Sequence, residues 1–491
     1  MATIKIEKFC GLQPRVNAAM LADGMATIAH NCRLKSGKLV PLMEPSVVTG
    51  APVRYENGLA DIKDAKSIHA WKLTAEDGST SIDFLLFPGV VWFAGGNIGD
   101  DPNDRVFVSG DTGMPFTDTT ATPHRVYANA PCLYLHNRGA NSFTRHVLCK
   151  NPLGHLNVSR NRSKSGDLDT DKDVRFTFLF ATWVDALGSE SGLSAPSFAK
   201  NGSEAEYTEQ TLEYNDGDYV SVDAITGIPN EAVAVRIWKV VSGSESQAIQ
   251  FVHEVSTEAA AIGFDFRVLD ENAGEVIPQF ESPPGDLRCI TRVPGNFYAG
   301  VIASAPKTVA FCEIDMPTSW PFDYRYDVED NVVCIAATTN TLFALTDGKV
   351  YTLTGTAPES MAVAKLADSA ACVSARSAVV VGASVYYASN DGLYMVYSDS
   401  DYGLLCKNIT EKFLTREQWE DLGPSSCVAQ ATESEIHLFF AKEEGGRVVR
   451  RNLNVNLLET RCALSTSDEV ASCACVDPRT GKMYYVRIGE E

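Results

Sequence analysis

The chain has 491 residues, 45% of them apolar, so it can bury either several small cores or one large β body. Its 63 acidic and 42 basic residues give a net charge of −21, which disfavours sequence-specific binding of a nucleic acid through a basic groove. No secretory leader pattern opens the chain, and no window of about 18 uninterrupted apolar residues occurs, so we expect a soluble protein that matures in the cytosol.

The thirteen cysteines are scattered mainly through apolar runs, for example at Cys289, Cys312 and Cys372. This distribution favours buried reduced thiols over a disulfide framework. Only Cys473 and Cys475 stand close together, as C-x-C, and in a strand both would point to one face. No second Cys or His pair lies near them, so a metal site or redox pair is disfavoured, and we predict no cofactor.

Acidic residues are concentrated in one stretch of the chain. Residues 201–285 contain sixteen acidic residues against Arg236, Lys239 and Arg267, so most of the net charge lies there. A solvated acidic face is the simplest interpretation.

In chain order, short runs of Val, Tyr, Phe and Ile alternate with Gly, Asp and Asn turns, which is typical of antiparallel strands. The apolar strand of each unit begins at Ile82, Cys132, Phe297, Leu342, Val385, Ile436 and Met483. The first two starts are 50 residues apart, and those from Phe297 onward are separated by 45, 43, 51 and 47 residues. Such spacing is the length of a four-stranded blade, so the sequence predicts an all-β propeller of about seven blades.

The regular spacing is interrupted between Cys132 and Phe297, which are 165 residues apart. One blade plus an insertion of about 120 residues would fill this interval. The polar stretch 161–173 reads as a surface linker, and the runs after it resemble the strands of a fibronectin-like or immunoglobulin-like sandwich. We therefore expect an inserted acidic β-sandwich over residues 165–285.

The carboxyl-terminal part contains one clear helix signal and an incomplete last blade. Thr415 and Gln418 have capping-box spacing, and Gly423-Pro424 should end this helix after about two turns. Almost nothing follows the strand at Met483, so strands within 33–43 are expected to complete the last blade and close the ring. The expected domains are 1–164 with the closing strands and first blades, 165–285, and 286–491 with the remaining blades.

Several motifs raise an enzyme hypothesis without supporting it. A propeller with a sandwich also describes sialidases, but Ser389, Asp391 and Gly392 have the wrong spacing for an Asp box and predict a hairpin turn instead. The stretch 167–174 lacks the Gly and closing Glu of a calcium loop. His30 and the histidine at 437 are interpreted as hydrogen-bonded structural residues. We predict no enzyme, and no catalytic, cofactor-binding or metal-binding residue.

Two stretches of the chain resemble virion proteins, the first those of tailed bacteriophages and the second those of short-tailed bacteriophages. The first, at 9–45, has the phrase that contains Gly11, Pro14, Arg15, Ala29, Asn31, Cys32, Leu34, Gly37, Leu39 and Pro41. The second begins at 282 and contains "Y-x-L-T-G-x-x-P-x-x-M" (351–361), "A-C-V-S-x-R-S" (371–377) and "Y-A-S-x-D-G-L" (387–393). These phrases are similar to the tail nozzle or hub, and the inserted sandwich is similar to one in that family. The order of the phrases carries the resemblance, which touches about three fifths of the chain.

The resemblance implies a structural virion protein of the tail, assembled in the cytoplasm of the host bacterium. It implies a homo-oligomeric ring, commonly of six copies, below the portal and the head-to-tail adaptor. Such a ring passes double-stranded DNA without sequence readout, offers surface to tail fibres or other tail proteins, and inserts into no membrane. The alternative hypotheses are a receptor-binding or glycan-binding adhesive propeller and, less favoured, a sialidase-like glycosidase.

Overall fold

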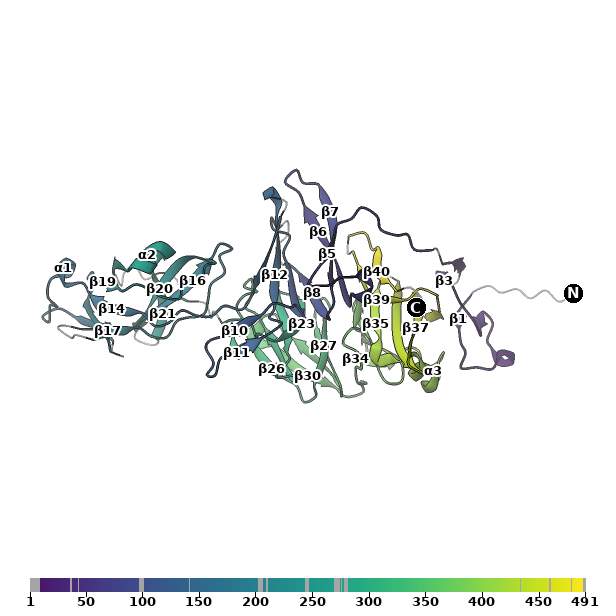
Figure 1. Cartoon of the computed structure of the whole chain (residues 1–491). Helices are drawn as coiled ribbons and strands as arrows, with labels where there is room; N and C mark the ends of the chain where they lie inside the picture. Colours follow the sequence, from purple (N-terminus) through teal and green to yellow (C-terminus); the bar gives the residue numbers. More distant parts are fainter. Residues whose placement is uncertain are drawn as a thin grey trace.

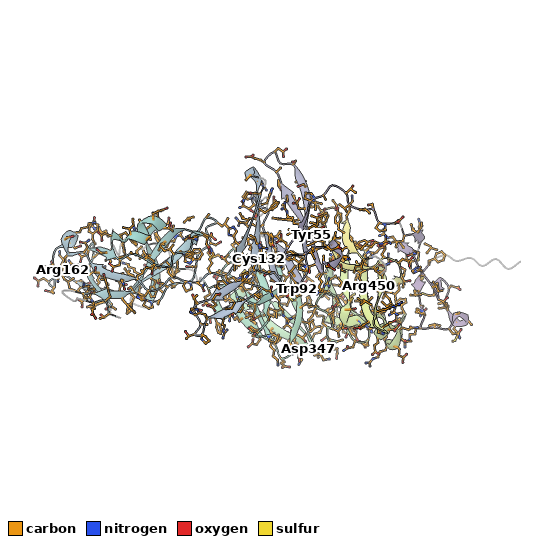
Figure 2. The ribbon with its side chains drawn as sticks, viewed as in Figure 1. Tyr55, Trp92, Cys132, Arg162, Asp347 and Arg450 are labelled. Carbon is orange, nitrogen blue, oxygen red and sulfur yellow. The ribbon has the colours of Figure 1, made fainter. Side chains whose placement is uncertain are left out.

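The structure is a computed structural model that consists of a propeller, an elongated sandwich at one end and an amino-terminal segment at the other (Figure 1). It describes residues 9–35, 38–42, 44–96, 101–140, 142–201, 206–208, 211–242, 247–268, 274, 276–277, 281–432, 434–458, 461–477 and 479–488. Arg162, at the tip of the sandwich, lies far from Asp347 and Arg450 of the propeller (Figure 2). No helix in these ranges is long and apolar enough to cross a membrane.

Seven sheets form the propeller, which confirms the predicted fold class and the predicted number of blades. Blade one contains β5 (Val53–Tyr55), β6 (Ser67–Thr74) and β7 (Thr80–Phe87). Blade two contains β8 (Val91–Gly95), β9 (Val106–Gly110), β12 (Cys132–Asn137) and β13 (Ser142–Val147). Blade three contains β23 (Leu287–Val293), β24 (Phe297–Ile302), β25 (Thr308–Phe311) and β26 (Arg325–Asp327).

The remaining four blades follow without interruption. Blade four contains β27 (Val332–Ala337), β28 (Leu342–Thr346), β29 (Val350–Thr354) and β30 (Ala362–Leu366). Blade five contains β31 (Val379–Val381), β32 (Ser384–Ala388), β33 (Leu393–Asp399) and β34 (Gly403–Asn408). Blade six contains β35 (Val428–Ala431), β36 (Glu435–Glu444), β37 (Arg447–Leu458) and β38 (Arg461–Ser465). Blade seven contains only β39 (Ala471–Val476) and β40 (Met483–Arg487).

Six of the seven predicted strand starts fall on the second strand of a blade, which in blades one and three to six contains a run of buried apolar residues, whereas only Val486 is buried in β40 of blade seven. The start at Cys132 is the exception, since it belongs to β12, the third strand of blade two. The 50-residue interval between Ile82 and Cys132 therefore runs from the second strand of blade one to the third strand of blade two.

The ring closes where blade seven meets blade one. Innermost strands contact one another in the order β6, β8, β23, β27, β31, β35 and β39, and β39 packs back on β6. An apolar cluster fills this last junction, made of Leu59, Ala65, Ile68, Ala70, Phe84, Leu86, Cys473, Cys475 and Val486. Near it, the Arg376 guanidinium Nη2 donates to the backbone oxygens of Lys66 and of Ser472, the latter at 2.6 Å. Arg376 thus connects the loop before blade five to blades one and seven.

The expectation that strands within 33–43 complete the last blade is wrong for the described part of the chain. Strand β3 (Cys32–Lys35) pairs with β4 (Lys38–Pro41), and this hairpin packs on β37 and β38 of blade six. Backbone hydrogen bonds at 2.8 Å join Thr466 to Ala29 and Asn31. The amino-terminal segment therefore pairs with backbone N–H and C=O groups of the chain that leaves blade six. Packing of β39 on β6 makes a shared strand unnecessary for closure.

The remaining amino-terminal elements also lie against blades five and six. Strand β1 (Gly11–Leu12) pairs with β2 (Met25–Ala26) and contacts β38. Gly11 has a φ of 93°, and a Cβ there would lie 2.7 Å from the backbone oxygen of Leu464, so only glycine permits this approach. The Arg15 guanidinium donates to the backbone oxygen of Glu411.

The inserted sandwich has two layers around its own core. One layer is β14 (Asn157–Arg160), β17 (Phe198–Lys200), β19 (Tyr219–Val222) and β22 (Phe264–Arg267). The other is formed by two sheets, β15 (Val174–Thr177) with β18 (Leu212–Asn215), and β16 (Leu179–Asp185) with β20 (Ala232–Ser242) and β21 (Gln247–Ser256). Helices α1 (Arg162–Ser165) and α2 (Thr257–Ile262) cap its edges.

The sandwich begins before the predicted boundary at residue 165. Strand β14 is already part of it, and Val158 is fully buried in its core. The stretch 161–173 therefore lies inside the sandwich, as α1 and the loop to β15, and is not a linker before it. The four-residue strand β14 is too short for its alternation to distinguish it from a polar loop in the sequence.

Outside the blades, α3 (Arg416–Leu422) has the predicted capping box between Thr415 and Gln418, and Gly423 ends it in the left-handed conformation. A hairpin of β10 (Phe116–Asp118) and β11 (Arg125–Tyr127) projects from blade two. Short 3-10 turns occur at Ala18–Met20, Ile62–Asp64, Arg138–Ala140, Phe322–Tyr324, Pro358–Ser360 and Pro424–Ser426.

Substitution of Arg376 tests the closure. Arg376→Ala should lower the free energy of unfolding by about 2–3 kcal/mol, because two backbone oxygens lose a charged donor. Urea denaturation measures the loss, with Arg447→Ala as control, since Arg447 is exposed on β37. Equal stability of the two variants would contradict the role of Arg376.

Excision of the sandwich tests its independence. The chains entering and leaving it lie side by side, because the Lys150 N–H donates to the Ser282 hydroxyl at 2.9 Å. Replacing residues 152–280 with a short Gly-Ser linker should leave a propeller that unfolds cooperatively in thermal denaturation followed by circular dichroism. An aggregated or non-cooperative product would show that the propeller needs the sandwich.

Candidate functional site at the open edge of the seventh blade

Blade seven has the fewest described strands of the seven blades, and β40 is its outermost one. It pairs with β39 on one side and with no described strand on the other, whereas blades two to six each have four strands. Tyr484 faces blade one, with its ring 4.9 Å from that of Phe84. Tyr485 faces blade six, with its ring 6.1 Å from that of Phe439. Both faces of β40 are therefore supported, but its outer edge is unpaired.

A cavity flanks each face of β40. On the side of blade one the cavity has a volume of about 610 Å³, and its walls are mostly apolar, with Val47, Val48, Val53, Phe84, Leu86 and Val486 among them. On the side of blade six the cavity measures about 260 Å³, and we call it the polar cavity because its lining includes Glu435, Asn452, Asn454 and Glu469, although Phe439 and Met483 line it as well. Pro45 lines both cavities, so the segment that follows β4 lies beside blade seven.

The polar cavity is built from alternating residues of β37 and from β36. Asn452, Asn454 and Asn456 point to one face of β37, as the period of two in a strand requires, and all three are buried. The Asn456 side chain donates to the Glu435 carboxylate at 3.0 Å, and His437 Nδ1 lies 2.8 Å from Asn454 Oδ1. These contacts fix the orientation of the side chains that line the cavity.

Charged groups in the polar cavity are largely paired. The Arg33 guanidinium of β3 donates to both oxygens of Glu435, from Nε at 3.1 Å, so the amino-terminal hairpin is held to blade six. Burial lowers the pKa of His437, which favours its neutral form. Glu469 accepts a hydrogen bond from the Tyr485 hydroxyl at 2.5 Å.

One group in this cavity has no partner. The Asn452 Oδ1 accepts from the Ser467 hydroxyl at 2.9 Å, but the Asn452 Nδ2 is buried without an acceptor among the described residues. Asn452 is only 3% exposed, so its unpaired donor is costly unless something in the cavity accepts from it.

A third cavity, of about 830 Å³, lies between the sandwich, the β10–β11 hairpin and blade three. Its wall includes Lys150, whose Nζ lies 2.5 Å from Asp185 Oδ2 and 4.4 Å from the centre of the Trp183 ring. The Trp183 indole in turn donates to the backbone oxygen of Asn151 at 2.9 Å. These contacts join the two units, so we interpret this cavity as part of the interdomain junction.

The cysteines and turn residues that the sequence analysis considered have structural contacts. Cys473 and Cys475 lie in the apolar junction of blades seven and one, and burial raises the pKa of their thiols to about 11 and about 12. No group of three or more His, Cys, Asp or Glu within the described ranges is arranged to hold a metal ion. Ser389 and Gly392 form the β32–β33 turn, with a backbone hydrogen bond of 2.9 Å, as predicted.

Local contacts define the conformation of the β32–β33 turn, of the stretch 167–174 and of His30. No residue of the β32–β33 turn has a positive φ, and a Cβ at Gly392 would displace the Asn408 side-chain amide, which donates to the backbone oxygen of Asp391 at 3.0 Å. The stretch 167–174 is a loop of the sandwich, with an Asp169–Lys172 ion pair at 3.2 Å. His30 is hydrogen-bonded as predicted, to Thr466 at 2.9 Å and to Asp468 at 3.0 Å.

The sequence analysis did not identify the open edge or the asparagine row. The signal for the row was the alternation in "NLNVN" at 452–456, which in a strand places three amides on one face. The prediction that strands within 33–43 complete the last blade implied that β40 is paired on both sides.

Comparison with known proteins identifies no family for this chain. No family model matches it, and no curated protein matches it. Solved structures do show similarity, including the N-terminal domain of Nup159, at 8% identity and a TM-score of 0.28. That alignment covers 48% of this chain and 59% of the Nup159 domain, so the chain spans less than two thirds of that relative.

Two bacterial proteins are similar at the same level. A protein from Lactobacillus plantarum has 10% identity and a TM-score of 0.24, with 78% of this chain and 95% of that chain covered. The extracellular domain of a protein described as a one component system from B. thetaiotaomicron has 10% identity and a TM-score of 0.28. It is covered over 51% of its length and 86% of this chain. Similarity this weak carries no argument about function.

Removal of Arg33 tests how the amino-terminal hairpin is held. Arg33→Ala should lower the free energy of unfolding by about 1 kcal/mol, because Glu435 is buried while Arg33 is half exposed. The hairpin should also become more sensitive to limited proteolysis. Lys38→Ala, on the exposed strand β4, is the control. Equal cleavage of the two variants would mean that the Arg33–Glu435 pair does not hold the hairpin.

Proposed function

We propose that the protein is a structural component of a phage tail, a nozzle or hub ring that continues the DNA channel below the portal and adaptor. The observation that carries the proposal is the ordered set of phrases shared with that family, at 9–45 and from 282 onward. In this proposal the ring retains DNA, lets it pass during ejection and offers docking surface to other tail parts.

Several residues of these phrases have structural roles in this chain, which supports the resemblance. Arg376, in the phrase 371–377, connects blades one and seven at the closure. Gly11 allows the close approach to Leu464, and Asn31 exchanges two hydrogen bonds with Asp468, at 2.6 and 3.1 Å. The shared residues therefore hold the ring and its amino-terminal segment together.

The charge of the chain is compatible with a conduit that does not bind DNA. A net charge of −21 repels phosphates, and attraction at each phosphate would slow a moving duplex. A rigid propeller packs through its faces and edges, and a closed ring of such blocks leaves an axial pore. We place the acidic sandwich on the outside of this ring, because it lies at one end of an elongated molecule (Figure 1).

Electron microscopy of the purified chain, with mass measurement in solution, tests this function. We expect six-fold rings of six times the monomer mass, with an axial pore wide enough for a duplex of about 20 Å. A monomer or trimer that binds glycans would instead favour the adhesive propeller. Glycan hydrolysis abolished by a single Asp or Glu substitution would favour the glycosidase and overturn the proposal.

A further inference from the structure

The cavity of about 830 Å³ at the junction of the two units is large enough for a small molecule. Its walls come from the β10–β11 hairpin, the sandwich, the two chain segments that join the sandwich to the propeller, and β26 of blade three (Figure 1). Ligand-binding cavities typically measure about 300–1,000 Å³ and often lie between domains. The Lys150–Asp185 pair holds the junction together, but it does not account for the other charged groups of the wall.

Two arginines of this wall carry charges that the chain does not pair. The Cζ atom of Arg325, on β26, lies 4.5 Å from the centre of the Phe322 ring. Its Nε atom is buried and has no acceptor in the described part of the chain. The Arg125 side chain, on β11, is exposed and forms no ion pair or hydrogen bond with any described residue. Unpaired guanidinium groups in a cavity favour an anionic ligand.

The nearby carboxylates of the wall are held by backbone amides instead of by these arginines. Glu281 Oε2 accepts from the Phe322 N–H at 2.7 Å. Asp286 Oδ2 accepts from the Ser304 N–H at 2.6 Å. Burial lowers the pKa of Arg325, and the carboxylates of Glu281 and Asp286 offset this effect only in part. The second oxygen of each carboxylate has no donor within the described ranges, so both can accept from a ligand.

Aromatic rings form another part of the wall. The rings of Phe116, on β10, and Tyr127, on β11, are stacked with their centres 6.5 Å apart and an angle of 18° between their planes. The Tyr127 ring packs on Gly285, so the segment that leaves the sandwich supports the hairpin. The face of an aromatic ring is electron-rich and attracts C–H groups that carry partial positive charge, such as those of a sugar ring.

We propose that this cavity binds a sugar acid, a carboxylate with one negative charge whose body carries hydroxyl groups. The carboxylate accepts hydrogen bonds from the Arg325 guanidinium, and Arg125 supplies a second positive charge. The hydroxyl groups donate to the second oxygens of Glu281 and Asp286, and the C–H face of the sugar packs on Tyr127. A phosphate dianion fits less well, because the carboxylates of the same wall repel its second charge.

This inference goes beyond the proposed function, since a sugar-acid site at the junction does not require a ring. The two remain separable. Binding by a six-fold ring would support both, and a six-fold ring without binding would overturn only the inference. Binding by a monomer or trimer would support the inference and favour the adhesive propeller over the nozzle.

The first experiment is calorimetric titration of the full-length chain with D-galacturonate and with D-glucuronate. We expect saturable binding of at least one of them. The matched controls are the neutral sugar and the sugar 6-phosphate, and we expect both to bind at least about tenfold more weakly than the sugar acid. Absence of binding, or equal binding of the neutral sugar, would overturn the proposal, and tighter binding of the phosphate would contradict the assigned carboxylate.

The same titration distinguishes two sources of the ligand. A sugar acid occurs free and as a unit of an acidic polysaccharide. Tighter binding of a hexuronate trisaccharide than of the matching monosaccharide would identify the polysaccharide as the source. Equal or weaker binding of the trisaccharide would identify the free sugar acid.

The second experiment repeats the titration with Arg325→Gln and Arg125→Gln. Each substitution removes one positive charge from the wall and should weaken binding of the sugar acid at least about tenfold. Arg447→Gln, exposed on β37, is the control and should bind as the unsubstituted chain does. Because Arg125 is exposed, Arg125→Gln should keep the melting temperature of the unsubstituted chain even if Arg325→Gln does not. Unchanged affinity in Arg125→Gln, or in a folded Arg325→Gln, would refute the assignment of the carboxylate to this wall.

Discussion

The packing of β39 on β6 is the contact on which the rest of the propeller depends. Each of the other junctions joins blades that are neighbours in sequence, but this one brings together segments about 400 residues apart. The apolar cluster of blades seven and one supplies the burial, and Arg376 supplies charged hydrogen bonds to backbone oxygens on both sides. Because the closure lies at the innermost strands, it does not require a strand shared between the two ends of the chain.

Because the ring closes through its innermost strands, the outer part of blade seven is not needed for closure. Blade seven ends at β40, with cavities on both faces of this strand. The amino-terminal segment is consequently free to pack on blade six, where the Arg33–Glu435 pair and the Thr466 backbone hold it.

The sandwich and the propeller differ in charge and in the contacts that they contain. The sandwich has its own core and much of the acidic charge, and it joins the propeller through the Lys150–Asp185 pair and the Trp183 indole. The propeller contains the closure, the open edge and the residues of the shared phrases.

The sequence by itself determined the all-β class, the number of blades and the helix at 416–422, because these follow from local patterns: a recurring buried second strand and a capping box. It also indicated the inserted sandwich, although not its first strand, since four residues of β14 carry too little alternation. Only the tertiary structure decided how the ring closes and where the segment 33–43 lies, because pairing between distant strands depends on which edges and apolar faces meet in space. The asparagine row at 452–456 was visible as a pattern, but only the folded ring places Asn452 and Asn454 in a cavity between blades six and seven.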